Sequence, residues 1–460
     1  MIIKKLCLNN FRCFDDFEMT FNETLTVIVA ENGMGKTAIL DAISIALGPF
    51  IGSFDTGLNK GFVNDDATLV VKKNTGSSYI MESLFPVRLK AEGIIDNDQI
   101  QWARSLSGMK SRTTIREASK LQNYAKTLQK EVREESQPEV VLPIVSYYGT
   151  GRLWDQKQLP HTNSKLTRSR LYGYSNALDP KSAYKHFAQW FRDESRAQYD
   201  SMIKMIESGS IDKHGVQVPT SRSIESIKEA TTICLKVNGW SNLRYDFEFQ
   251  ELTADHPKFG TIPVSRLSDG VRNMIGMVAD IAYRCTKLNP QLENAPKETS
   301  GIVLIDEVDM HLHPRWQQVV LQTLEEAFPK IQFIVTTHSP QVLSTVDKSR
   351  IRIIRTESGT EAADSSRFVS IEPEFQTKGV ASYEALAKIM GIDPVPNVEE
   401  ATWISAYKEA IEMGTENETG DLWDKIWHHF GEDHPEVLEC KRLLRLSVMK
   451  KKLTDKKANA

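Results

Sequence analysis

The sequence lacks the features that mark secreted, membrane-spanning and nucleic-acid-coating proteins. Its five cysteines are odd in number and scattered, which argues against a disulfide framework and against a paired-cysteine metal site. No stretch approaches the ~20 apolar residues that span a bilayer, and the first residues lack the apolar core of a signal peptide. The net charge of −4 argues against indiscriminate coating of nucleic acid. We therefore expect a cytoplasmic protein with no membrane partner.

Two further absences concern the middle and the end of the chain. No sustained heptad repeat is present, so no long coiled-coil arm is expected. Helical patterns at 115–132, 182–206 and 224–236 predict a compact helical insertion instead. No acidic Asp-x-Asp pattern follows residue 373, so we expect no nuclease domain within the chain itself.

The clearest feature that is present is the segment AENGMGKTAIL, Ala30 to Leu40. It lies between an apolar, β-branched run, Thr24–Val29, and a helical pattern, Thr37–Gly48, in which Gly48 is a plausible C-cap. Apart from Ala30 in place of the first glycine, it has the spacing of a Walker A loop. Backbone N–H groups of such a loop point at a phosphate from the positive end of a helix.

This loop predicts an ATP site. Lys36 is expected to bridge the β- and γ-phosphates, and the Thr37 hydroxyl to ligate Mg²⁺. The alternative is a glycine-rich turn with a chance lysine, which a Walker B strand elsewhere in the chain would argue against. The residues expected to contact ATP in this loop are Asn32, Gly33, Gly35, Lys36, Thr37 and Ala38.

A Walker B pattern is found in GIVLIDEVDMHLHP, Gly301 to Pro314. Four apolar residues precede Asp306 and Glu307, and a buried parallel strand places such carboxylates at its C-terminal edge, where α/β sheets bind ligands. Asp306 is expected to hold Mg²⁺ through water, and Glu307 to act as the general base that polarises the attacking water. Both motifs together argue against a core strand with chance acidic residues.

Two more segments refine the class. RLSDGVRNMIGMVADIAYR, Arg266 to Arg284, predicts an amphipathic helix with Ser268 and Asp269 at its start and Gly270 allowing close backbone approach. The alternative is an ordinary N-capped helix. IQFIVTTHSP predicts a buried strand that ends near His338.

These segments resemble ABC-type ATPases. Leu267–Val271 resembles their signature, which implies that Ser268, Asp269 and Gly270 contact the γ-phosphate of a nucleotide bound to the other subunit. His338 matches their switch histidine, a sensor of the γ-phosphate. The implied fold is an α/β ABC-type P-loop ATPase head with a central parallel or mixed sheet, a helical insertion between lobes and a C-terminal helical module.

The branch is indicated by two shorter segments. DEVDMHLHP resembles the D-loop of RecF, SMC and OLD-type ATPases, which implies that Asp309 lies near a dimer seam. LNNFRCF resembles the opening of the same branch, in which the residue that matches Arg12 lies near the phosphates. A metal site at His311 and His313 has no supporting ligands.

The motifs divide the chain into four expected parts. Residues 1–100 form the N-terminal lobe with the Walker A loop, 101–240 the helical insertion, 241–372 the rest of the ATPase core and 373–460 a C-terminal helical module that docks a partner. Within the core, the alternating segment Leu243–Gln250 predicts a strand.

The C-terminal module has no complete catalytic set. Trp403, Trp423 and Trp427 are expected to be exposed and to anchor a partner, the alternative being that they pack against the ATPase core. From Lys441 onward there are eight lysines and arginines and one acidic residue. A solvated, frayed tail is the usual meaning of such a run, and contact with nucleic acid or a partner is the alternative.

Three segments, YYGTGRLW, LSDGVRNMIGMVADIAYR and MGIDPVPNVEEATWISAYKEAIEMG, resemble the PtuA ATPases of Septu anti-phage systems and those encoded beside retrons. The resemblance covers essentially the whole chain. It implies ATP and Mg²⁺ as cofactors, a homodimer or higher even oligomer, a separate HNH nuclease subunit (PtuB) and, beside a retron, a reverse transcriptase with its msDNA. The alternative function is a RecF- or SMC-like repair or recombination ATPase that acts directly on DNA.

Overall fold

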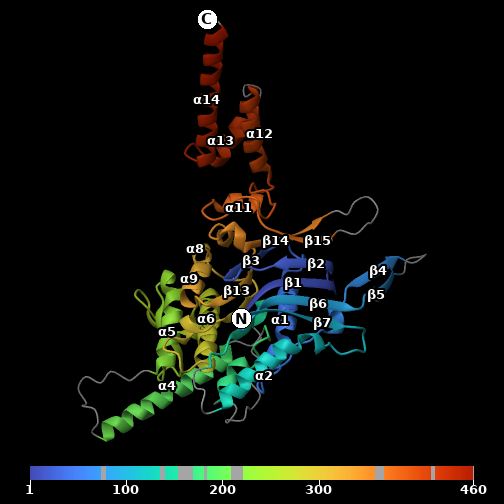
Figure 1. The fold of residues 1–460 in the computed structure, drawn as a ribbon. Coiled ribbons are helices and arrows are strands. Elements are labelled where there is room, and N and C mark those ends of the chain that lie inside the picture. Colours follow the sequence, from blue (N-terminus) through green and yellow to red (C-terminus); the bar gives the residue numbers. More distant parts are fainter. Residues whose placement is uncertain are drawn as a thin grey trace. The chain divides into compact units, whose positions relative to one another are not determined.

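The computed structural model contains two compact units, Met1–Ala385 and Leu386–Ala460 (Figure 1). Each unit is described by itself. The residues that the structure describes are 1–73, 79–134, 140–153, 169–180, 184–208, 221–357, 367–415 and 420–458.

The first unit is built around a six-stranded sheet in the order β15-β14-β3-β13-β12-β8. Five of its strands run parallel, and β15 pairs with β14 in antiparallel register. Every residue of β3, β8, β12 and β13 is buried, as expected of the apolar runs that parallel sheets require because both faces are covered. The bounds are β3 Leu25–Val29, β8 Ile144–Tyr148, β12 Gly301–Ile305, β13 Ile331–Thr336, β14 Ile351–Glu357 and β15 Arg367–Ile371.

A second sheet is antiparallel, in the order β2-β1-β6-β7. In β6, buried and less buried positions alternate, as expected where one face of a sheet covers the core. The helix α1, Lys36–Ile51, contacts β13 of the first sheet and β6 and β7 of the second. The bounds are β1 Ile2–Phe11, β2 Phe14–Thr20, β6 Val87–Ile95 and β7 Asp98–Leu106, and two small sheets contain β4 Leu69–Lys73 with β5 Tyr79–Ser83, and β9 Ser241–Asp246 with β10 Glu251–His256 and β11 Gly260–Pro263.

The helix after the Walker A loop does not end at Gly48, contrary to our prediction. It continues to Ile51, and Gly52 is the C-cap. Gly48 is required for packing, because a Cβ there would lie 2.1 Å from the carbonyl oxygen of Lys60. The proline at position 49 cannot bond the carbonyl one turn earlier, and Arg104 Nη1 donates to that Ile45 oxygen at 2.8 Å instead.

The helical segments predicted in the middle of the chain are confirmed as α2 Ser119–Arg133, α4 Tyr184–Glu207 and α5 Arg222–Leu235. The interval 101–240 is nevertheless not purely helical, because it also contributes β7 and β8 to the two large sheets. The remaining helices of this unit are α6 Asp269–Leu288, α7 Ala295–Glu298, α8 Pro314–Gln317, α9 Val320–Ala327 and α10 Pro340–Leu343, and α11 Ser382–Lys388 spans the boundary between the units.

The strand predicted over Leu243–Gln250 is too long. β9 ends at Asp246, whose carboxylate accepts hydrogen bonds from the backbone N–H groups of Glu248 and Phe249. An aspartate that bonds the backbone two and three residues ahead closes a turn. The hydrophobic alternation in the sequence therefore continues to Gln250, past Asp246, where the hydrogen-bonded pairing of β9 ends.

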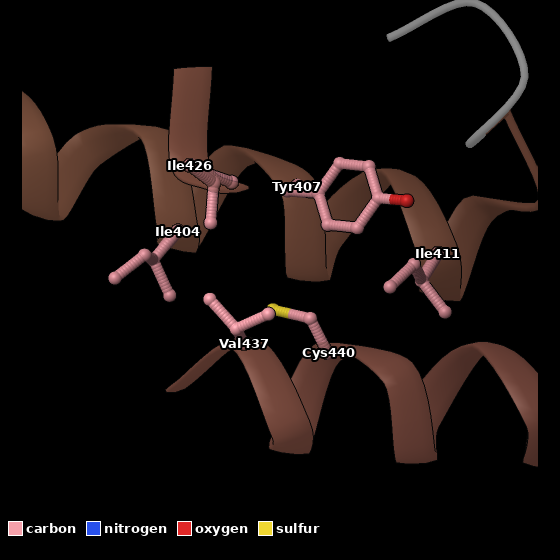
Figure 2. Close-up of a cluster of buried hydrophobic side chains, with 6 residues drawn as sticks. All are labelled: Ile404, Tyr407, Ile411, Ile426, Val437 and Cys440. Atoms are coloured by element: carbon pink, nitrogen blue, oxygen red, sulfur yellow. The ribbon is translucent and has the colours of Figure 1, made fainter. Parts of the chain in front are cut away.

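The second unit contains α12 Glu399–Met413, α13 Gly420–Phe430 and α14 Pro435–Ala458. The three helices enclose a small core, drawn in Figure 2, of Ile404, Tyr407, Ile411, Ile426, Val437 and Cys440. Trp403 and Trp423 are partly buried against this core, and Trp423 stacks on Tyr407. Two of the three tryptophans therefore pack within the module, and only Trp427 is exposed among them.

None of the described helices carries an apolar stretch long enough to cross a membrane.

Candidate functional site

The Walker A loop connects β3 to α1, as the sequence predicts. Gly33 and Gly35 have φ angles of 82° and 83°, a left-handed conformation that favours glycine. Gly35 is also packed tightly, since a Cβ there would lie 2.5 Å from Phe14 Cζ and 2.7 Å from Cys13 Sγ. The first turn of α1 contains no acidic residue, so nothing there offsets the positive end of the helix dipole. The loop therefore has the backbone form of a phosphate-binding site.

Lys36 is turned back onto its own loop. Its Nζ donates to the carbonyl oxygens of Ala30 at 2.8 Å and Glu31 at 3.0 Å, and the residue is buried. Burial lowers the pKa of Lys36, while the charges of Asp306 and Glu307 oppose that shift. The ammonium group is thus held at the mouth of the loop by two neutral acceptors, which phosphate oxygens can replace.

The two motifs meet through one hydrogen bond. Thr37 Oγ1 donates to Asp306 Oδ2 at 2.8 Å, although the two residues come from distant parts of the sequence. Asp306 follows β12 directly and is almost fully buried. A hydroxyl and a carboxylate side by side are oxygen ligands of the kind that Mg²⁺ prefers. The residues present therefore fit the predicted Mg²⁺ site.

A threonine that the sequence reading did not single out supports both Walker B carboxylates. Thr336, the last residue of β13, donates from Oγ1 to Asp306 Oδ1 at 2.6 Å. The same oxygen accepts the backbone N–H of Glu307 at 2.8 Å. Glu307 has a φ of 48°, uncommon for a residue with a side chain and a form of strain found at functional sites. The pair Thr336–Thr337 before His338 is the only signal in the sequence that points to this support.

His338 follows β13 in the same cluster of charges. Burial lowers its pKa, the nearby Lys36 lowers it further, and Glu307, Asp309 and Asp306 oppose the shift. The imidazole is therefore neutral near pH 7 and can offer an N–H to a phosphate oxygen. The neighbouring Thr337 donates from Oγ1 to Asp309 Oδ1 at 2.5 Å, which ties the D-loop to the switch segment.

The signature segment lies at the start of α6. Ser268 is the N-cap residue, its hydroxyl makes no capping hydrogen bond, and it is exposed. Asp269 pairs with Arg272. A Cβ at Gly270 would lie 2.3 Å from the His311 carbonyl oxygen, so the glycine allows α6 to pack against the D-loop.

A side-chain hydrogen bond strengthens this contact, since Asn273 Nδ2 donates to the Met310 carbonyl oxygen at 3.2 Å. The structure thus brings the signature helix and the D-loop of one chain together. The contact of Ser268 with a second subunit's nucleotide stays a prediction.

Arg12 lies beside the loop but is engaged elsewhere. Its Nη1 donates to Asp41 at 2.8 Å and its Nε to Asp66 at 2.9 Å. Burial alone would lower the pKa of Arg12, but Asp41 and Asp66 outweigh it and the pKa is raised. The guanidinium thus links Asp41 of α1 to Asp66 of the 3₁₀ helix Asn64–Asp66, and a role of Arg12 at the phosphates stays a prediction.

The histidines of the D-loop do not form a metal site in the part of the chain that the structure describes. His311 and His313 are exposed. His313 Nδ1 accepts the backbone N–H of Arg315 at 3.3 Å and caps α8 ahead of Pro314.

Two protein-family models match the chain. The AAA domain model matches residues 5–230, and the model of an AAA domain described as a putative AbiEii toxin of a type IV toxin–antitoxin system matches residues 130–344. Among solved structures, the SMC head bound to the C-terminal winged-helix domain of ScpA is 17% identical, with a TM-score of 0.44, and covers 81% of this chain and 98% of that chain. The fold assignment rests on the sheet and loops described above and not on this likeness.

The curated relatives are more informative. The chain is 28% identical to the Retron Vc95 probable ATPase of Vibrio cholerae, over 90% of this chain and 84% of that protein. It is 26% identical to the Retron Ec83 probable ATPase of Escherichia coli, over 94% and 85%. It is 21% identical to the Septu protein PtuA of Bacillus thuringiensis, over 97% and 98%. With its P-loop, Walker B pair and α/β sheet, the chain is similar over almost its whole length to the PtuA-like ATPases of retron and Septu defence systems.

Proposed function

We propose that the chain hydrolyses ATP in a Mg²⁺-dependent reaction and thereby regulates a separate nuclease in antiviral defence. The observation that carries the ATPase part is the 2.8 Å hydrogen bond between Thr37 and Asp306, which joins the Walker A and Walker B motifs in one site. Bound Mg²⁺ would neutralise charge on the β- and γ-phosphates beside these two oxygens.

The residues of the chain divide the remaining work. Lys36 leaves the carbonyl oxygens of the loop and donates to phosphate oxygens. Glu307 accepts a proton from the water that attacks the γ-phosphorus, and the bond from that phosphorus to the β–γ bridging oxygen breaks to leave ADP. His338, neutral near pH 7, donates to the γ-phosphate.

We further propose that the active site is shared by two copies of the chain. Ser268 is exposed at the positive end of the twenty-residue helix α6, with a hydroxyl that caps nothing in its own helix. Such an end is suited to the γ-phosphate of a nucleotide held by the facing subunit. The arrangement gives a homodimer, from which higher even oligomers can be built.

Mixing two inactive variants tests the sharing. Lys36→Ala damages the phosphate loop, and Ser268→Arg damages the signature. In a mixed dimer one site carries both defects and the other carries none, so ATPase activity should partly return on mixing. Absence of recovery, with mixed dimers demonstrated by differently tagged chains, would contradict a shared site.

The C-terminal unit is proposed as the docking module for an HNH nuclease subunit. Trp427 is 40% exposed although the preceding residue, Ile426, is buried in the core of the module, and α14 exposes Leu438, Leu446 and Met449. Tryptophan is enriched among the residues that form interface hot spots. Where a retron accompanies the system, the reverse transcriptase and its msDNA are the further proposed partners.

A second candidate function follows from the charge of α14. Lys441 and the residues after it contain eight basic side chains and one acidic one, and basic stretches of this kind bind phosphate backbones. An ATPase that acts directly on DNA would use them. ATPase stimulation of the isolated protein by DNA, lost at high salt, would favour this function over regulation of a nuclease.

A further inference from the structure

A buried polar network connects the signature helix to the Walker B strand without touching the nucleotide site. The hydroxyl of Tyr148 donates to Asp280 Oδ2 at 2.7 Å, and Arg284 Nε donates to the same oxygen at 2.7 Å. Asp280 and Arg284 belong to α6, one turn apart. Tyr148 is the last residue of β8. The network thus joins α6 to the strand that flanks Walker B.

The backbone of Tyr148 continues the connection to the site. Its carbonyl oxygen accepts the N–H of Asp306 at 2.8 Å. β8 and β12 run in parallel register, with Tyr148 opposite Ile305. A displacement of β8 at this point therefore moves the backbone of the carboxylate that faces Thr37.

Arg284 fixes the other end of the network. Its Nη1 donates to the carbonyl oxygens of Gly173 at 2.8 Å and Ser175 at 3.0 Å, in and just after the 3₁₀ helix Arg170–Tyr174. These two carbonyl oxygens are neutral. Among the described residues, Asp280 is the one carboxylate that bonds Arg284.

The network is not what stability alone favours. Asp280 is fully buried, and its Oδ1 has no hydrogen-bond partner among the described residues. Burial raises the pKa of the Asp280 carboxyl, which Arg284 and Tyr148 oppose. Replacing a buried ion pair by apolar side chains is often neutral or stabilising. An incompletely paired carboxylate between two functional elements therefore indicates a positioning role.

We propose that Tyr148, Asp280 and Arg284 are positioning residues that hold the Walker B strand in register with the signature helix, so that Asp306 is set for Mg²⁺. The proposal rests on the proposed function in one respect, namely that Asp306 is a Mg²⁺ ligand. It adds residues to the ATPase that lie outside the Walker A loop, the Walker B carboxylates and the signature residues Leu267–Val271.

The test compares two buried tyrosine hydroxyls, of which one donates to a carboxylate of α6 and the other to a backbone carbonyl oxygen ahead of β8. Tyr148→Phe removes the bond to Asp280. Tyr174→Phe removes an equally buried hydroxyl, which donates to the Pro143 carbonyl oxygen at 2.8 Å, and serves as the matched control. Full-length proteins are titrated with Mg²⁺ in the presence of a fluorescent, non-hydrolysed ATP analogue, and their thermal unfolding is recorded.

Tyr148→Phe should need roughly tenfold more Mg²⁺ for half-maximal binding, with a similar fall in kcat and an unchanged KM for ATP, which is the low end of the weight of a hydrogen bond to a charged group. Tyr174→Phe should match the wild type in Mg²⁺ response. Asp280→Asn, which keeps the shape and removes the charge, should shift the Mg²⁺ response in the same direction, and serves if Tyr148→Phe does not fold.

Two results would overturn the inference. One is a wild-type Mg²⁺ response in a folded Tyr148→Phe or Asp280→Asn protein. The other is an equal change in Tyr174→Phe. Asp306→Ala separates this failure from failure of the proposed function. If Asp306→Ala abolishes the Mg²⁺ response, the ligand assignment stands and only the positioning role is wrong; if it does not, the ligand assignment itself is wrong.

Discussion

Thr336→Val should impair catalysis more than its conservative appearance suggests. Valine has nearly the shape of threonine, so the fully buried site stays filled. The substitution removes the 2.6 Å bond to Asp306 Oδ1 and the 2.8 Å bond from the Glu307 N–H. A hydrogen bond to a charged group contributes ~1.5–3 kcal/mol and a neutral one ~0.5–1.5 kcal/mol.

Part of that loss is recovered when the Asp306 carboxylate and the Glu307 N–H form hydrogen bonds with water or with each other. We expect about 2 kcal/mol to remain as a loss of transition-state stabilisation, because both Walker B carboxylates are then less well placed. That corresponds to a roughly 30-fold lower kcat. The measurement is phosphate release at saturating ATP and Mg²⁺, together with thermal unfolding.

Two controls make the Thr336 experiment decisive. Thr336→Ser keeps the hydroxyl and should restore most of the activity. Thr231→Val removes a buried hydroxyl whose partners are the Ile227 and Lys228 carbonyl oxygens of its own helix α5, at 2.9 and 3.0 Å, and should leave kcat unchanged. The reasoning is refuted if Thr336→Val keeps kcat within about twofold of the wild type, or if the Ser and Val variants are equally impaired.

Three further outcomes are expected. Lys36→Ala should weaken ATP binding itself, because the phosphates lose their charged partner; equilibrium dialysis with ATP showing unchanged affinity would contradict this. Trp427→Ala should keep the ATPase rate and lose capture of a co-expressed HNH nuclease, whereas retained capture would exclude that surface. The pKa of His338 is lowered in the folded protein, so the folded state favours the neutral imidazole. This contribution to stability is lost as the pH falls below about 6.5, the ordinary pKa of histidine. The fall in melting temperature between pH 7.5 and 5.5 should therefore be smaller in His338→Asn than in the wild type.

The sequence locates the loop between β3 and α1 and the two carboxylates after β12 because these motifs are local. The Walker A loop follows from residue spacing between a strand and a helix, and Asp306 and Glu307 follow from a run of apolar residues that ends in two acids. The 2.8 Å contact between Thr37 and Asp306 is a consequence of placing β3, β13 and β12 side by side in one sheet.

The parts that were missed depend on contacts between distant segments. Thr336 supports Asp306 from a neighbouring strand, and its sequence signal is only a pair of threonines. Gly48 appeared to end a helix, but it is needed for the approach of the Lys60 carbonyl oxygen. Trp403 and Trp423 read as exposed anchors because their periodicity does not reveal that three short helices enclose a core.

The central claim is that Glu307 is the general base of an ATPase site built by Thr37 and Asp306, and Glu307→Gln tests it most directly. Glutamine keeps the shape and the backbone hydrogen bond to Thr336, but it cannot accept the proton. The variant should bind ATP with near wild-type affinity, sediment as an ATP-stabilised dimer, and release phosphate ~10²–10⁴-fold more slowly in a single turnover. Near-normal phosphate release by the folded variant would contradict the claim.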